Sequence, residues 1–433
     1  MNKNLKVIEY KGRTFSILAM PNTDIFRFEI ICNKGASLER VYKKLHGKTV
    51  YGISHLIEHM SFKSTRDFSS KELLAQLKAN GTYNASTWFD QIRYFYSTIS
   101  EKWEFAVDSV TNETFNDLKN VTEEEFLKER SVVYNEVKRY NDNSQTMFNF
   151  NVNNQIRGHD SEDNVLGTPE IIETLTLGDC IAMKSLMLTE ESHKYVLVYD
   201  PTKLSLETVL DKITNMIDGF PKNEFDENVD HLYWNMSGEY DHNHAFIPSD
   251  SDQSIVRAQM TLDKYSAFDV GYILNYISSM SEYSLNNSIR EEHGLTYGIS
   301  MYPSMLHHSL DLIFSCDVSK GNEDLTATLF KEAFDKILNG FTEEEYNAFM
   351  FKKRLSVSLS KLDQKRYLDY ADIPFNDPMS YGEWKDVMSN NIEDADDKYQ
   401  EKMTYDRMRE IISYITDKVN NNEYKLIYGV KEE

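Results

Sequence analysis

Alternation of apolar and polar residues predicts β-strands at the beginning of the chain. Within residues 5–32 the apolar positions recur at the two-residue spacing that buries one face of a strand; they are Leu5, Val7, Phe15, Ile17, Phe26, Phe28, Ile30 and Cys32. From about residue 52 to 62 the spacing becomes helical. A second helix is expected over 70–79, because Asn80 and Gly81 are typical of helix ends.

The same spacing predicts the elements that follow. Strands are expected at 82–87 and 92–99, then helices at 101–115 and 122–140. Thr122 and Glu125 open the second of these helices as a capping signal. Helical segments at 170–187, a strand at 195–199 and a helix at 206–217 complete the first half. A strand at 254–262, helices over 267–292, strands to about 317, several helices and a closing strand at 425–430 make up the second.

A polar, turn-rich stretch separates two halves with a similar order of elements. It runs from about 219 to 252 and shows little periodicity. We therefore expect a first domain at 1–220, a linker at 221–252 and a second domain at 253–433. A local echo supports duplication, since Thr82-Tyr83 recurs as Thr296-Tyr297 after a glycine-containing segment (296 − 82 and 297 − 83 are both 214).

Composition describes an ordinary globular protein. Of 433 residues, 40% are hydrophobic and 27% are charged, which excludes a disordered chain. No apolar run has the length of a leader or a membrane span, so a cytoplasmic protein without a membrane partner is expected. Cys32, Cys180 and Cys316 lack metal or redox spacing, which favours buried, reduced thiols.

The charge balance excludes one class of partner. Seventy acidic residues against 47 basic ones give a net charge of −23, which argues against binding nucleic acid. The excess acid is either a solvated surface or partly the lining of a cavity that attracts basic peptides.

One pentapeptide combines residue types and spacing that indicate a metal site. In His55-Leu56-Ile57-Glu58-His59, the two histidines are four apart, so both imidazoles project from one face of a helix. They form half of a zinc site, because catalytic zinc takes three protein ligands and leaves a position for water. Glu58 directly precedes the second histidine, whereas in the commoner His-Glu-x-x-His motif the acid directly follows the first. The pentapeptide is therefore the inverted form of that motif. The alternative is a helix with two merely exposed histidines.

The third ligand must come from another element, and the helix at 122–140 offers candidates. Glu129 and Glu136 are two turns apart on one face. Either could bind the metal while the other orients a histidine. Residues 123–125 lie at the helix start, where acids favour the helix dipole. In the second copy, the positions equivalent to the motif at the offset of 214 are 269–273, and they hold no pair of histidines. The second copy is therefore expected to carry no metal ligands.

These residues together resemble the pitrilysin/insulinase superfamily of inverted-motif zinc peptidases. The resemblance is to its short, two-domain subfamily, which contains mitochondrial processing peptidase β subunits and bacterial homologues. It rests on HLIEHMSFKST, NGTYNASTWFD, VLGTPEIIETLTLGD and SIREEHGLTYG, which span nearly the whole chain. It implies an α+β fold of two homologous α/β-roll domains, each an antiparallel-rich sheet packed with helices, forming half of a clamshell. It also implies Glu136 as the third zinc ligand and Glu129 as the supporting acid.

The resemblance extends to substrate contacts. It implies that the segment at Asn84 and Ala85 is an edge strand that pairs with the substrate backbone, which is β-augmentation. Arg290 and Tyr297 match residues that reach from the second domain to the scissile peptide. An arginine can fix a carbonyl and a phenol can donate to an oxyanion. His293, between them, is expected at the surface.

The implied function is zinc-dependent endopeptidase activity on unfolded peptides or flexible segments, with Glu58 as general base. Zinc is inferred from the ligand types, and manganese or cobalt could substitute. Because longer family members contain four such domains, a homodimer or a heterodimer with a related chain is expected. The alternatives are a non-catalytic or partner-dependent subunit of a processing peptidase, and a peptide-binding scaffold.

Overall fold

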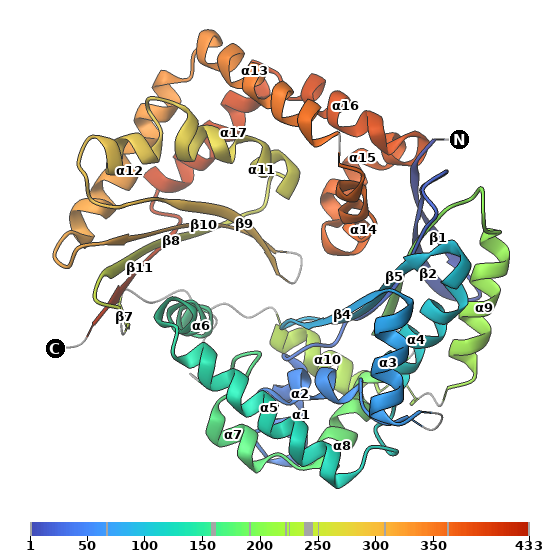
Figure 1. The fold of residues 1–433 in the computed structure, drawn as a ribbon. Helices are drawn as coiled ribbons and strands as arrows, with labels where there is room; N and C mark the ends of the chain where they lie inside the picture. Colours follow the sequence, from blue (N-terminus) through green and yellow to red (C-terminus); the bar gives the residue numbers. More distant parts are fainter. Residues whose placement is uncertain are drawn as a thin grey trace.

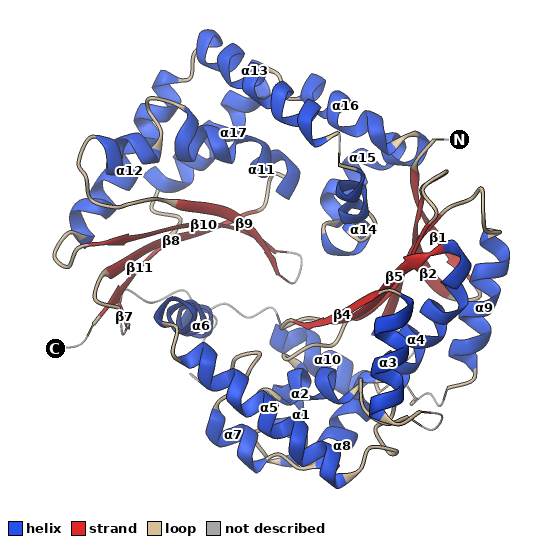
Figure 2. Ribbon diagram, in the orientation of Figure 1, coloured by secondary structure: helices blue, strands red, loops and turns tan. Residues whose placement is uncertain are grey.

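The chain forms two halves, each with a β-sheet and helices on its outer side (Figure 1). The structure is a computed structural model that describes residues 2–65, 68–156, 162–189, 192–220, 223–224, 226–237, 246–249, 251–306, 309–361 and 363–431. The open faces of the two sheets are turned toward each other, as the colouring by secondary structure makes plain (Figure 2). Each half therefore has one covered sheet face and one face toward its partner.

The first sheet places an edge strand where a substrate could join it. Among the described residues its strand order is β1-β2-β6-β3-β5-β4, so β4 is at the edge. The strands are β1 (Asn4–Tyr10), β2 (Arg13–Ala19), β3 (Ile25–Cys32), β4 (Thr82–Thr87), β5 (Ile92–Ile99) and β6 (His193–Tyr199). Along β5, Ile92, Tyr94 and Tyr96 are buried against the helices while Arg93 faces the second half.

Ten helices of the described residues belong to the first half. They are α1 (Leu38–His46), α2 (Ile53–Met60), α3 (Ser70–Asn80), α4 (Trp103–Phe115), α5 (Glu123–Asn141), α6 (Ser144–Ile156), α7 (Pro169–Thr174), α8 (Leu177–Met187), α9 (Leu206–Asp218) and α10 (Glu227–Ser237). The expected capping signal is present, because Thr122 and Glu125 form a reciprocal capping box at the start of α5. Helix α2, which carries the histidines, packs between α5, α8 and β4.

The five-stranded sheet of the second half repeats five of the six strands of the first sheet, all but β1. Its order is β7-β11-β8-β10-β9 in the described part of the chain. Both sheets contain one parallel pair, β2 with β6 and β7 with β11, followed by antiparallel pairs out to an edge strand. The strands are β7 (Phe246–Pro248), β8 (Ser254–Leu262), β9 (Ser300–Leu306), β10 (Ser309–Val318) and β11 (Lys425–Val430). The expected α+β fold with two related domains is confirmed.

The helices of the second half differ from expectation in one respect. The segment expected to be helical over 267–292 holds α11 (Ala267–Asn275) and two π-helical turns, Tyr276–Met280 and Asn287–Glu291. The others are α12 (Glu323–Gly340), α13 (Glu343–Ser360), α14 (Ile373–Asn376), α15 (Pro378–Asn390), α16 (Ala395–Lys402) and α17 (Tyr405–Asn420). Across the described ranges, no helix combines the length and apolar character needed to cross a bilayer.

The expected linker at 221–252 is not an irregular connection throughout, and that expectation needs correction. Residues Glu227–Ser237 form α10, which packs against α1. Val229 and Tyr233, four apart, are buried in the first core, so the helix belongs to the first half. The helix is only 11 residues long and lies in a polar, turn-rich stretch, so its periodicity is not conspicuous in the sequence. Residues 221–222, 225, 238–245 and 250 of the expected linker lie outside the described residues.

Several contacts fasten the halves at the end of the molecule where α14 and α15 lie (Figure 1). The Ser16 hydroxyl in β2 donates to the Ala371 carbonyl over 2.5 Å, and both residues are buried. Arg93 in β5 pairs with Asp372 over 2.7 Å. The segment before α14 therefore rests on the open face of the first sheet.

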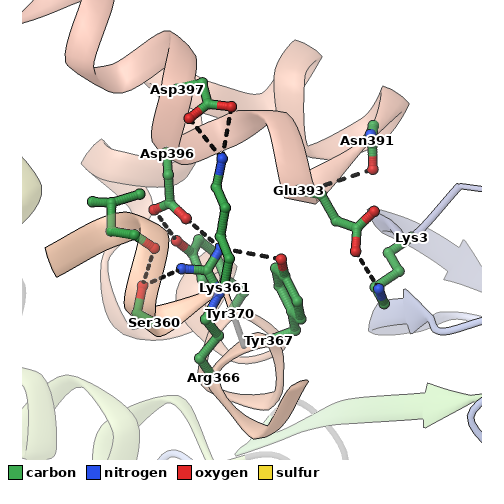
Figure 3. Close-up of polar contacts among 11 residues, drawn as sticks. Lys3, Ser360, Lys361, Arg366, Tyr367, Tyr370, Asn391, Glu393, Asp396 and Asp397 are labelled. Atoms are coloured by element: carbon green, nitrogen blue, oxygen red, sulfur yellow. Dashed lines mark hydrogen bonds and ion pairs between the residues drawn. The ribbon is translucent and has the colours of Figure 1, made fainter. Parts of the chain in front are cut away.

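A polar cluster stabilises the segment before α14 (Figure 3). Lys361 bonds both oxygens of Asp397 at 2.6 and 2.7 Å, and Arg366 pairs with Asp396, which joins the end of α13 to the start of α16. Glu393 accepts from Lys3, just before β1. The cluster thus connects the second half to the beginning of the chain.

Candidate metal centre and its surroundings

The start of α2 is fixed by a buried carboxylate from α1. The backbone N–H groups of Gly52 and Ser54 donate to the two oxygens of Glu39 over 2.9 and 2.8 Å. Gly52 has φ of 89°, and a Cβ there would lie 2.4 Å from the Leu166 carbonyl oxygen. Burial raises the pKa of Glu39 to about 8, against the effect of these N–H donors. Glu39 has no sequence signature for this role, because an acid in a first helical turn ordinarily just favours the helix dipole.

The two motif histidines project from the same side of α2. Their ring centroids are 4.7 Å apart and their planes are 82° apart. His55 is 8% exposed, and burial, followed by the charge of His59, lowers its pKa to about 3. His55 is therefore neutral at physiological pH, the form that has a lone pair for a metal. Its Nδ1 is buried and has no hydrogen-bond partner in the described part of the chain.

Glu136 lies beside both histidines. In the described part of the chain, His55, His59 and Glu136 are the group of potential ligands whose donor atoms all lie within 4.8 Å of one another. His59 Nε2 and Glu136 Oε2 are 3.5 Å apart. Two ligand atoms about 2.1 Å from a tetrahedral zinc ion are separated by roughly 3.4 Å. The donor set and this spacing therefore fit zinc.

Glu129 orients the second histidine. Its Oε1 lies 2.9 Å from His59 Nδ1, and its Oε2 lies 2.6 Å from Lys63 Nζ. If Nδ1 carries the proton and donates it to Glu129, Nε2 is free to bind a metal. Burial alone raises the pKa of Glu129, but the hydrogen bonds from His59 and Lys63 outweigh it and lower that pKa. Glu129 is thus held as an anion facing His59.

Glu58 lies under the edge strand. The Thr87 hydroxyl, at the end of β4, donates to Glu58 Oε2 over 2.7 Å. Burial raises the pKa of Glu58, and the nearby Glu136 raises it further, against Thr87 and His59. A carboxylate whose pKa is raised toward neutrality is suited to take up and return a proton. Thr87 was not among the expected site residues; it lies two residues after Ala85, on the same face of the strand.

The edge strand presents the two residues expected to meet a substrate on opposite faces. In the β4–β5 pairing, Asn84 lies opposite Phe95 and Ala85 lies opposite Tyr94. Ala85 is buried toward the helices, whereas Asn84 is exposed. Because β4 is paired on one side only, its other side is available for an added strand.

Arg290 and Tyr297 are not brought into contact with the motif. The Arg290 guanidinium carbon lies 5.2 Å from the centre of the Tyr297 ring, and Nε lies 3.4 Å from Glu291. Tyr297 is 91% exposed. Within the described residues, no hydrogen bond or ion pair joins either one to the motif. His293 is exposed, as expected, and its Nδ1 lies 2.6 Å from the Ser288 carbonyl oxygen.

The counterpart of the motif in the second half has a structural role. Asp269, in α11, is fully buried and accepts from Tyr399 over 2.9 Å and from Arg407 over 2.8 Å. These bonds hold α11 to α16 and α17. The position that corresponds to His55 after the 214-residue shift therefore fastens helices together.

Two family models match successive parts of the chain. Residues 46–170 match the family described as Insulinase (Peptidase family M16), and residues 202–350 match the one described as Peptidase M16 inactive domain. The chain is 34% identical over 123 residues to the zinc protease PqqE of Helicobacter pylori, covering 28% of this chain but only 26% of that protein. It is 22% identical over 357 residues to an uncharacterized zinc protease of Rickettsia bellii, covering 80% and 81% of the two chains.

Solved structures share the fold over the whole chain. A protease from Helicobacter pylori superposes with a TM-score of 0.71 at 16% identity, covering 100% of both chains. The periplasmic protease PqqL of Escherichia coli superposes with a TM-score of 0.67 at 13% identity, covering 99% of this chain and 48% of that one. With two family models in the expected order and the fold shared end to end, the chain belongs to the pitrilysin/insulinase superfamily of peptidases.

Proposed function

We propose that this protein is a zinc metalloendopeptidase acting on unfolded peptides or flexible protein segments. The observation that carries the proposal is the convergence of His55, His59 and Glu136 beside Glu58, under an open sheet edge. A structural zinc site would be closed by four protein ligands, whereas three ligands leave a position for water. The membership of the superfamily and the names of the relatives agree with this reading.

His55, His59 and Glu136 hold the metal in this proposal. A zinc ion supplies Lewis-acid chemistry, lowering the pKa of water and polarising a carbonyl group. Glu58 removes a proton from the attacking water and returns it to the leaving amine. Glu129 keeps the proton of His59 on Nδ1, so that Nε2 faces the metal. Thr87 holds the Glu58 carboxylate in place from above.

The substrate lies along β4 in this proposal. Its backbone pairs with the free side of the strand at Asn84 and Ala85, which selects extended segments by main-chain hydrogen bonds. Arg290 and Tyr297 meet the scissile peptide once the two halves close on the substrate, and there they stabilise the developing oxyanion. We assign the first domain to residues 1–237, including α10, and the second to 253–433.

A test of the proposal separates turnover from metal binding. Glu58→Gln should abolish hydrolysis of an unfolded protein substrate while retaining zinc, since the substitution removes the base but no ligand. Glu101→Gln, an exposed residue outside the site, is the control and should retain both activity and zinc. Undiminished hydrolysis by Glu58→Gln would reject the mechanism, and loss of zinc from it would reject the assignment of ligands.

A partner-dependent subunit is the second candidate, and three observations favour it. Tyr297 and Arg290 do not contact the motif, and the second half matches a model described as an inactive domain. The PqqL chain is about twice as long as the part that matches this chain. We therefore propose a dimer, homodimeric or with a related chain. Light scattering of the purified protein should give twice the mass of the chain if it is a homodimer, and a dimer with a related chain should form only when that chain is added; a fully active monomer would contradict both.

A further inference from the structure

A cavity between the halves begins one residue beyond the end of β4. It has a volume of about 290 Å³, close to the size of a small ligand pocket. We call it the Trp88 cavity, defined by Trp88, Arg93, Lys194, Trp234, Met305 and Phe375. Met305 in β9 and Phe375 in α14 come from the second half, which reaches toward β4 there (Figure 1). The cavity therefore lies between the two halves and next to the proposed path of the substrate.

Its walls are tryptophans that the fold leaves partly exposed. The chain has four tryptophans; Trp88 is 56% exposed and Trp234 is 49% exposed, whereas Trp384 is buried. Large aromatic surfaces left in a cavity are typical of binding sites, since each offers wide apolar contact at a small loss of side-chain entropy. Between them they suit a bulky apolar side chain.

The position of Trp88 is held by its backbone. The Trp88 N–H donates to the Gln91 carbonyl over 2.8 Å, and its own carbonyl accepts from the Ala36 N–H over 2.9 Å. A Cβ on Gly35 would lie 2.2 Å from the Trp88 oxygen, so only glycine permits this approach. The Tyr233 hydroxyl donates to the Asp90 carbonyl over 2.9 Å, which fastens α10, and with it Trp234, to the same turn. Both walls are thus positioned before any ligand arrives.

The floor of the cavity carries positive charge. Arg93 is neutralised by Asp372 at 2.7 Å and Glu29 at 3.4 Å. Lys194, in β6, lies over the Phe375 ring at 5.2 Å and has no carboxylate partner among the described residues. Asp90 also lines the cavity, and it already interacts with another part of the chain. Lys194 is therefore a cation available to a ligand, in a chain whose net charge is −23.

The cavity is close to the chemistry. Thr87 bonds Glu58, and Trp88 follows it directly. A peptide paired with β4 advances about 3.3 Å per residue, so it passes from Glu58 to the cavity in roughly two or three residues. The cavity can thus read a substrate residue near the scissile bond.

We infer that the Trp88 cavity is a specificity pocket for a bulky apolar substrate side chain accompanied by a carboxylate. The apolar group lies between Trp88 and Trp234, and the carboxylate pairs with Lys194. The carboxylate belongs to an acidic side chain or to the C-terminus of the peptide, which is the same chemistry from two sources. The inference rests on the proposed peptidase function. At this cavity it predicts a preference for a carboxylate, whereas the net negative charge of the protein would suggest a preference for basic peptides.

Binding to a variant that cannot turn over tests the pocket separately from catalysis. The protein is the zinc-loaded full-length Glu58→Gln chain, and binding is measured by calorimetry. The probes are capped peptides of equal length in which a Phe and an Asp, separated by one alanine so that both side chains point to the same face of a strand, are moved together one position at a time; this probe is called Phe-Asp. Matched peptides named in the same way are Phe-Asn, Phe-Lys and Ala-Asp, and a further pair ends in Phe with a free or an amidated C-terminus. At one position, Phe-Asp should bind about tenfold more tightly than Phe-Asn; a preference seen only for the free C-terminus assigns the carboxylate to the chain end.

Substitutions then locate the preference. Adding Lys194→Met should abolish the discrimination between Phe-Asp and Phe-Asn, and Lys194→Glu should reverse it in favour of Phe-Lys. Trp88→Ala should remove the preference for Phe over Ala. Lys203→Met, an exposed lysine beyond the other end of β6, should leave every affinity unchanged. Thermal unfolding of each variant excludes misfolding as the cause.

The outcomes separate the two proposals. Equal affinities at every position and for both C-termini, or a preference that persists in Lys194→Met, would overturn the pocket even if the wild-type chain hydrolyses peptides. A Lys194-dependent preference in a chain whose wild type hydrolyses nothing would support the pocket and reject the proposed peptidase.

Discussion

At the scale of single residues, the chemistry of the metal centre depends on partners that fix protonation. Glu129 faces His59 Nδ1, and Thr87 faces Glu58. The residue types and spacing of the motif identify His55, Glu58 and His59 from sequence, because helix geometry makes positions four apart neighbours. Thr87 and Glu39 could not be found that way, since their roles come from strand and helix packing that no local spacing records.

The partner of His59 should determine metal affinity. Glu129→Gln should lower zinc affinity by about 10- to 100-fold, because the amide is a weaker acceptor and no longer raises the basicity of the imidazole. Competition with a chromogenic chelator measures this. Glu124→Gln, exposed in the first turn of the same helix, is the matched control. If both variants bind zinc with equal affinity, Glu129 has no role in the metal centre.

A buried acid in α4 gives the stability of the protein a pH dependence. Glu113 is 1% exposed, neither oxygen has a hydrogen-bond partner in the described residues, and burial raises its pKa well above the usual value. The folded chain keeps this proton while the unfolded chain loses it, so stability falls as pH rises above the unfolded pKa. The loss is up to about 1.4 kcal/mol per pH unit until the folded pKa is reached.

Replacing that acid should therefore remove part of the slope. Glu113→Gln should unfold at a higher temperature than the parent at about pH 8, and the gain should shrink toward about pH 5. Thermal unfolding across this range, with Glu104→Gln as an exposed control on the same helix, measures the difference. A constant difference between variant and parent at all pH values would show that Glu113 is ionised in the folded chain.

At the scale of elements, several strands were predicted closely and short helices were not. The ranges 82–87, 254–262 and 425–430 are β4, β8 and β11, because each is a short run of β-forming residues preceded by polar, turn-forming residues. Helix α10 is short, and its buried face consists of Val229, Leu232 and Tyr233 within a polar stretch, so the sequence indicates a linker there. The π-helical turn at 287–291 has no sequence signature, because it differs from α-helix in hydrogen bonding rather than in side-chain pattern.

The start of α2 should be sensitive to the acid that holds it. Glu39→Gln replaces one acceptor with an amide donor facing a backbone N–H, which should cost about 1–3 kcal/mol. The unfolding temperature of the metal-free protein should fall accordingly, and zinc affinity should fall with it as the helix start loosens. Glu123→Gln is the exposed control. Unchanged stability would mean that Gly52 and its neighbours position α2 without Glu39.

At the scale of the whole molecule, two related halves turn their sheets toward one another (Figure 2). The duplication was visible in sequence as the repeated Thr-Tyr segment, and the matching strand order supports it. How far apart the two halves lie could not be predicted from either half. For that reason the sequence indicates Arg290 and Tyr297 as site residues but does not indicate whether they contact the motif.

Closure of the halves should be visible in kinetics. Tyr297→Phe removes only the hydroxyl, so it should lower kcat by about 10²- to 10³-fold with zinc content unchanged, if the phenol meets the oxyanion when the halves close. Tyr302→Phe, an exposed tyrosine in β9, is the control. A kcat equal to that of the parent would restrict the second half to shaping the cleft.

The central claim is that one zinc ion, held in the first half, makes this chain a peptidase. Its most direct test is the rate of peptide hydrolysis as zinc is titrated into chelator-stripped protein. We expect no hydrolysis before zinc is added, and then a rate of hydrolysis that rises linearly until one zinc ion is bound per chain. The rate of the Glu136→Gln variant should not recover at the same zinc concentrations. Full hydrolysis by the stripped protein, or full recovery in Glu136→Gln, would contradict it.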